Sequence, residues 1–124
     1  STIIHLAAIV GEKAVANDES YANEVNINGT IKIAELARRN QSKLIFISTG
    51  HVYKSSVKDL SENSEVELIS KYAGQKLSAE KNMFEVLSDS KFGGMALRVF
   101  SLLDFGMPAD TLGGAAERLD NSRD

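Results

Sequence analysis

A tyrosine and a lysine stand four residues apart in SKYAGQKLSAEK (70–81), a stretch that reads as a helix. At this spacing Tyr72 and Lys76 lie about 40° apart around the helix axis, so the phenol and the ammonium project from one face toward a shared ligand. The cation is expected to lower the tyrosine pKa from its usual value near ~10, which suits a general acid or base. Chance alone gives such a pair in about one chain in five, and the alternative is a solvated helix pair.

A second candidate group ends the run KLIFIST (43–49), which reads as a buried strand. Ligands of open α/β sheets bind at the carboxyl ends of strands, where Thr49 would lie. Its hydroxyl is expected to contact a substrate oxygen beside Tyr72, and the alternative is that it satisfies the loop backbone. Gly50 and His51 follow as further candidates for substrate contact, although a single loop histidine is more often solvated.

The first apolar run, TIIHLAAIV (2–10), reads as a strand buried on both faces. The small residues Ala7 and Ala8 of HLAA (5–8) would let a flat ring approach the backbone, although small residues near a strand end are also ordinary packing.

Strands and helices alternate along the chain and must position these groups. Strands are predicted at 2–10, 43–49 and 94–100, helices at 21–39 and 71–88, and a long exposed loop at 50–67. This order favours a parallel sheet with right-handed crossovers. The predicted fold class is therefore α/β, a doubly wound parallel sheet.

Helical spacing predicts which side of each helix is buried. The first helix is expected to pack through Ala22, Val25, Gly29, Ile33, Leu36 and Ala37. The second is expected to pack through Ala73, Leu77, Phe84 and Leu87. Gly29 would let the helix approach the sheet closely. Beyond Ser101, a loop around Pro108 and a short helix at 115–119 are expected.

Composition narrows the class of protein. The 124 residues carry a net charge of −3 with scattered Lys and Arg, which argues against a nucleic-acid partner. No cysteine is present, which suits a reducing cytoplasm, and no metal site is predicted. The longest apolar run is too short to cross a membrane, so no membrane partner is expected.

Four motifs occur in a fixed order along the chain. They are IIHLAA (3–8), the Asn-x-x-Gly-Thr of NINGT (26–30), ISTGHVY (47–53), and Tyr-x-x-x-Lys (72–76) with Leu77 and Glu80 after it. With LRVF (97–100), they resemble the extended short-chain dehydrogenases/reductases, the NAD-dependent epimerases and dehydratases that act on nucleotide sugars. The resemblance spans residues 3 to about 106 and implies a Rossmann-type fold.

The resemblance implies a role for each matched residue. Tyr72 would be the acid/base during hydride transfer to or from the nicotinamide of NAD or NADP. Lys76 would hold the nicotinamide ribose and keep the tyrosine pKa low, and Thr49 would orient the substrate oxygen. Ala7 and Ala8 would line the cofactor pocket. Asn26 would support the active site, and the alternative is an amide that satisfies backbone groups.

Three departures from the family pattern bear on function. Gly50 and His51 stand where 4,6-dehydratases carry Asp-Glu, so dehydration is disfavoured. Ser101 replaces an asparagine common in the family. The glycine-rich turn that cradles the pyrophosphate is absent. Residues 1–124 are therefore expected to be the second half of a dinucleotide-binding domain, an incomplete fragment without the first strands that would be inactive alone.

The leading hypothesis is an NAD(P)-dependent oxidoreductase or epimerase of a nucleotide-activated sugar. A deoxysugar (4-keto) reductase of the same family is the nearest alternative. A non-catalytic dinucleotide-binding sensor or interaction module is a second alternative, which the joint presence of Thr49, Tyr72 and Lys76 disfavours. A cytoplasmic homodimer is expected by analogy with the family.

Overall fold

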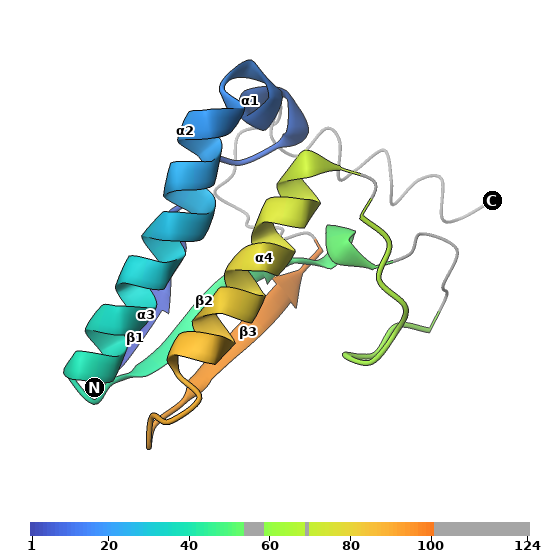
Figure 1. Cartoon of the computed structure of the whole chain (residues 1–124). Coiled ribbons are helices and arrows are strands. Elements are labelled where there is room, and N and C mark those ends of the chain that lie inside the picture. The colour runs from blue at the N-terminus through green and yellow to red at the C-terminus, as the bar shows by residue number, and fades with distance from the viewer. Residues whose placement is uncertain (54–58, 69, 101–124) are drawn as a thin grey trace, which may run out of the picture.

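A computed structural model describes residues 1–53, 59–68 and 70–100. Its sheet has three parallel strands in the order β1 (Thr2–His5), β2 (Lys43–Thr49) and β3 (Gly94–Val99). The two long helices lie on one face of this sheet, and the three strands run in the same direction (Figure 1). The predicted α/β fold with a parallel sheet is confirmed.

The connection from β1 to β2 is more broken than the single helix predicted at 21–39. It contains α1 (Glu12–Asn17), α2 (Glu19–Asn23), the π-helical turn η1 (Glu24–Asn28) and α3 (Gly29–Arg39). The Asp18 side chain caps α2 by accepting a hydrogen bond of 3.0 Å from the Tyr21 backbone N–H. The last three elements follow one another without a break and together correspond to the predicted helix. The helix α1 was not predicted.

The connection from β2 to β3 contains the short 3-10 turn η2 (Gly50–Val52) and the helix α4 (Lys71–Val86). The Ser70 hydroxyl caps α4 by accepting from the Ala73 N–H at 3.1 Å. The helix predicted at 71–88 is confirmed. The exposed loop predicted at 50–67 is wrong at its start, because Gly50, Val52 and Tyr53 are buried.

The core lies between β2 and the helices α3 and α4. Leu44 and Phe46 of β2 are almost fully buried. They pack with the buried residues Ala34, Ala37, Ala79, Met83 and Leu87. Because three of these residues are alanines, the helices approach the sheet closely around the two large side chains.

The predicted buried sides of the helices are wrong in three places. Leu36 is 39% and Phe84 45% exposed, whereas two polar residues of the first predicted helix, Asn26 and Thr30, are buried. These two polar residues face the sheet because they satisfy polar groups beside β1, as described below. Gly29 does not permit a close approach, since an added Cβ would make only an ordinary contact of 3.6 Å with the Glu24 carbonyl.

The strands are not buried on both faces by the described residues, contrary to prediction. On the face away from the helices, Ile4, Met95 and Leu97 are between 42% and 58% exposed. The first strand also ends at His5 and not at residue 10, and Leu6 and Val10 are exposed. Ser101, Pro108 and the helix predicted at 115–119 lie outside the described residues.

Within the described part of the chain, no helix combines the length and the apolar character that a membrane span requires.

Candidate active site

The carboxyl ends of the strands and the start of α4 lie at the same end of the molecule (Figure 1). Thr49, the last residue of β2, is only 4% exposed. Its Oγ1 accepts a hydrogen bond of 3.2 Å from the His51 backbone N–H, which is the loop-satisfying contact considered as the alternative. Because this bond uses an oxygen lone pair, the Thr49 hydroxyl hydrogen can still be donated to another oxygen.

Lys76 lies in the second turn of α4 and is 3% exposed, so it is not part of a solvated pair. Its Nζ donates to the Ile47 carbonyl at 2.7 Å and lies 4.3 Å from the centre of the Phe46 ring. Burial lowers the pKa of Lys76 to about 8, and the nearby Glu80 carboxylate only partly opposes this shift. The lysine thus holds its charge in a largely dry site at the end of β2.

Tyr72 lies one helical turn before Lys76 and is half-buried. Burial raises the pKa of Tyr72, which is opposite to the direction predicted from a neighbouring cation. The physical reason is that the half-buried phenol is partly desolvated, which disfavours its charged form. The phenol is therefore protonated at neutral pH in this structure.

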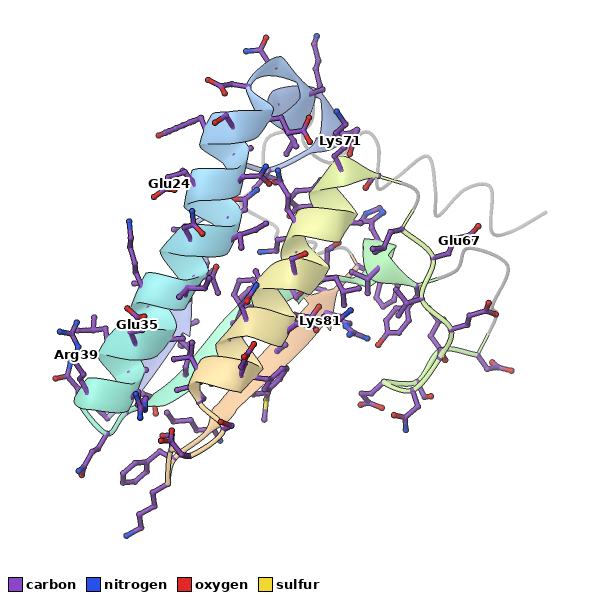
Figure 2. The ribbon with its side chains drawn as sticks, in the orientation of Figure 1. Glu24, Glu35, Arg39, Glu67, Lys71 and Lys81 are labelled. Carbon is purple, nitrogen blue, oxygen red and sulfur yellow. The ribbon has the colours of Figure 1, made fainter. Side chains whose placement is uncertain are left out.

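The first turn of α4 is held from outside by α1. The Glu12 carboxylate accepts from the backbone N–H groups of Lys71 and Tyr72, both at 3.2 Å. The Tyr72 N–H bond is the main cause of the lowered pKa of Glu12, as expected for a carboxylate at a helix N-terminus. Lys71, at the start of α4 in Figure 2, forms an ion pair of 2.7 Å with Glu19. Both acidic residues therefore tie α1 and α2 to the helix that carries Tyr72.

Asn26 is 1% exposed and bonds to the backbone of the segment that follows β1. Its Oδ1 accepts from the Ile9 N–H at 2.7 Å, and its Nδ2 donates to the Ile9 carbonyl at 3.0 Å. These contacts match the structural alternative for Asn26. The same segment carries Ala7, which is exposed, and Ala8, which is half-buried, and their place in a cofactor pocket stays a prediction.

His5, at the end of β1, belongs to the same buried region. Thr30 Oγ1 donates to the Asn26 carbonyl at 2.9 Å, so the His5 Nε2 at 3.0 Å must donate to Thr30. The His5 ring stacks on Phe46 at 5.5 Å between centroids. Burial, followed by the charge of Lys76, lowers the pKa of His5 and keeps its ring neutral. The sequence motif contained His5, but nothing in it indicated this bond.

Glu80 joins α4 to two strands. It accepts from the Ser48 hydroxyl at 2.7 Å and forms an ion pair of 3.0 Å with Arg98 of β3. The Arg98 guanidinium lies 4.9 Å from the centre of the Tyr53 ring. A cleft of about 500 Å³ adjoins this group and is lined by Tyr53, Leu60, Ser61, Glu62, Glu80, Phe84, Ala96, Leu97, Arg98 and Phe100. Sequence reasoning named Glu80 only as part of a motif and gave no role to Arg98.

The two other predicted substrate residues, Gly50 and His51, differ in exposure. Gly50 is buried beneath the Phe100 ring, which occupies the space that a Cβ at this position would need. His51 is exposed. Substrate contact by either residue stays a prediction. The described residues contain no group of three or more His, Cys, Asp or Glu side chains placed to hold a metal ion.

A known protein family and a related sequence match this chain. Residues 1–107 match the family described as the NAD dependent epimerase/dehydratase family. The UDP-N-acetyl-alpha-D-glucosaminuronate decarboxylase of Bacillus cytotoxicus is 35% identical over 63 residues, which make up 51% of this chain and 20% of that protein.

Two solved structures have similar folds. MoeE5 in complex with UDP-glucose and NAD superimposes with a TM-score of 0.79 at 25% identity, over 89% of this chain and 38% of that one. The UDP-N-acetylglucosamine 4-epimerase from Methanobrevibacter ruminantium M1, in complex with UDP-N-acetylmuramic acid, gives 0.75 at 25% identity, over 87% and 37%. The chain thus spans less than two fifths of either structure. The predicted resemblance is confirmed, and the chain belongs to the NAD dependent epimerase/dehydratase family.

Proposed function

We propose that the protein is an NAD(P)-dependent oxidoreductase or epimerase that acts on a nucleotide-activated sugar, with Tyr72 as its acid/base. The observation that carries this proposal is the bond of the buried Lys76 ammonium to β2, the strand that ends at Thr49. Lys76 bonds to Ile47, two residues before Thr49, and Tyr72 precedes it by one turn of the same helix. A hydroxyl, an ammonium and a phenol from two elements are the groups that this reaction needs.

The donor set fits a nicotinamide ribose. Lys76 uses one N–H to bond the Ile47 carbonyl, which leaves two N–H groups for the hydroxyls of a sugar. When bound, the nicotinamide supplies or accepts the hydride. Tyr72, protonated because burial raises its pKa, donates its proton to a substrate oxygen in the reducing direction. Thr49 donates its hydroxyl hydrogen to the same oxygen and so orients the substrate.

The comparisons support the substrate class. A curated relative carries the name of a UDP-sugar decarboxylase, and the two solved structures are complexes with UDP-sugars. Dehydration is disfavoured because Gly50 and His51 replace an acidic pair, and a deoxysugar reductase remains the nearest alternative activity. NAD and NADP both fit the proposal.

We also propose that residues 1–124 form the second half of a Rossmann-type domain in a cytoplasmic homodimer. The fraction of the two solved structures that the chain spans supports the first part. Exposed apolar side chains on the neighbouring helices α3 and α4, Leu36 and Phe84, support the homodimer.

The test is Tyr72→Phe in the complete product of the gene, with nucleotide sugars and both dinucleotides as substrates. Turnover is expected to fall about 10²- to 10⁴-fold, the usual contribution of a positioned acid/base, while dinucleotide binding is kept. Tyr21→Phe is the matched control, because Tyr21 is 59% exposed on α2. Undiminished turnover by Tyr72→Phe refutes the assigned role. Tight dinucleotide binding without turnover of any nucleotide sugar by the unmodified protein favours the sensor alternative.

A further inference from the structure

A row of side-chain amides crosses from α2 to the segment after β1, and Gln75 of α4 is its central member. Gln75 is 5% exposed. Its Nε2 donates to Asn23 Oδ1 at 2.8 Å, and its Oε1 accepts from Asn26 Nδ2 at 2.8 Å. Asn26 in turn bonds both backbone groups of Ile9. The row therefore connects α4 to the backbone at residue 9.

The hydrogen-bonding groups fix the direction of every amide in this row. The Ile9 N–H is only a donor, so Asn26 must turn its Oδ1 toward it. Its Nδ2 then carries two hydrogens, of which one reaches the Ile9 carbonyl and the other reaches Gln75. An apolar side chain at position 75 would leave the second hydrogen buried and unpaired, because Asn26 is 1% exposed.

The position of the row relates it to the proposed site. Gln75 directly precedes Lys76 in α4, and Ile9 directly follows Ala8 in the segment that is proposed to line the cofactor pocket. Asn26 lies in the π-helical turn η1, and π-helical turns are frequent at functional sites. The amide row thus joins the helix that carries Tyr72 and Lys76 to the backbone that is proposed to line the cofactor pocket.

We propose that Gln75 is a positioning residue for the dinucleotide. Through Asn26 it fixes the backbone of residues 7–9, and so it sets the affinity for the nicotinamide end of the cofactor and leaves proton transfer by Tyr72 unchanged. This inference rests on the proposed function.

The test uses Gln75→Leu and Gln75→Glu in the complete gene product. Gln75→Leu is expected to raise the Kd and the KM for the dinucleotide about tenfold, while kcat at saturating cofactor and its pH profile stay within about twofold of the unmodified protein. Gln75→Glu is expected to restore affinity to within about threefold, because one carboxylate oxygen still accepts from Asn26. The other oxygen cannot donate to Asn23 as Gln75 does, so the Asn23 amide must turn and donate from its Nδ2. Asn82→Leu is the matched control, since this α4 amide donates to the Ser78 carbonyl of its own helix.

Amide hydrogen exchange gives a readout that does not need the cofactor. The Ile9 N–H is expected to exchange about tenfold faster in Gln75→Leu and at the original rate in Gln75→Glu. Unchanged affinity in a folded Gln75→Leu variant overturns the inference while the proposed function stands. A fall in kcat with a shifted pH profile and unchanged affinity also overturns it. If Gln75→Leu does not fold, failure of Gln75→Glu to keep wild-type affinity overturns it. If the unmodified protein binds no dinucleotide, the proposed function fails, and Ile9 exchange alone tests whether Gln75 holds this segment.

Discussion

Replacing Lys76 by methionine is expected to stabilise the fold at neutral pH and at the same time to abolish activity. The Lys76 ammonium is 3% exposed, and burial lowers its pKa from 10.5 to about 8. At pH 7 the group is still charged, so the folded state keeps a cation where a neutral side chain would be favoured. Methionine has a similar length and an apolar stem that can occupy the same space against Phe46.

The size of the effect follows from the pKa. At about 1.4 kcal/mol per pH unit, keeping this ammonium charged at pH 7 costs the folded state about 3 kcal/mol. Methionine leaves the Ile47 carbonyl without its lysine donor, which costs about 1 kcal/mol. The variant is therefore expected to be about 2 kcal/mol more stable at pH 7, with a Tm higher by roughly 5–10 °C.

The sign of the stability difference between Lys76→Met and the unmodified protein changes with pH. The folded-state pKa of Lys76 is below its unfolded value, so between about pH 8 and 10.5 the unfolded chain binds more protons than the folded one. The stability contributed by this site in the unmodified protein therefore rises with pH across that window, whereas Lys76→Met has no such group. The advantage of the variant is expected to shrink and to reverse near pH ~10, where only the lost hydrogen bond remains.

Urea unfolding of both proteins at pH 7 and near pH 10 measures the difference between their free energies of unfolding. Titrating groups that both proteins share cancel in this difference. Lys81→Met is the control, because Lys81 is an exposed lysine on the same helix. It is expected to change stability by less than about 0.5 kcal/mol at both pH values. A Lys76→Met variant that is less stable at pH 7, by an amount that does not vary with pH, refutes the claim that the buried charge is costly.

Two further predictions concern packing and assembly. Met83→Ala should lower the free energy of unfolding, measured in urea, by about 2–5 kcal/mol, because Met83 is fully buried. The neighbouring Phe84→Ala should lower it by less than about 1 kcal/mol. Equal losses would contradict the observed orientation of α4. In sedimentation, the complete gene product should be a dimer, and the double variant with Leu36→Glu and Phe84→Glu should be a monomer. A monomeric unmodified protein would exclude the proposed homodimer.

The elements that the sequence predicted well are those whose signal is local. The apolar runs of β2 and β3 and the long helix α4 lie within a few residues of their predicted limits. The helix α1 was missed because only Val15 among its six residues is buried, so its sequence has no apolar periodicity. The π-helical turn Glu24–Asn28 lies inside the helix predicted at 21–39, and the apolar spacing of that segment did not mark it.

The sequence predicted those parts of the candidate site that depend on spacing within one helix. It did not predict the contacts that depend on residues far apart in the chain. The four-residue spacing identified Tyr72 and Lys76 as a pair. It could not show that the Lys76 ammonium bonds to Ile47, 29 residues away, or that burial raises the pKa of Tyr72. Glu12 and Gln75 were missed for the same reason, because their partners lie 49 or more residues away in the chain.

The polar inner face of α4 explains why the helix keeps residues that weaken its packing. Gln75, Lys76 and Glu80 are all buried, and they bond in turn to Asn26, to the backbone of β2 and to Ser48 and Arg98 of β2 and β3. Among the described residues, no buried side-chain nitrogen or oxygen lacks a partner. An apolar face would pack against the sheet without the cost of desolvating two charges, but it would slide or rotate more freely. Directional bonds to β2 and β3, and through Asn26 to the segment after β1, fix the rotation and height of α4 and therefore the position of Tyr72. The retained cost at Lys76 is best accounted for by the proposed reaction.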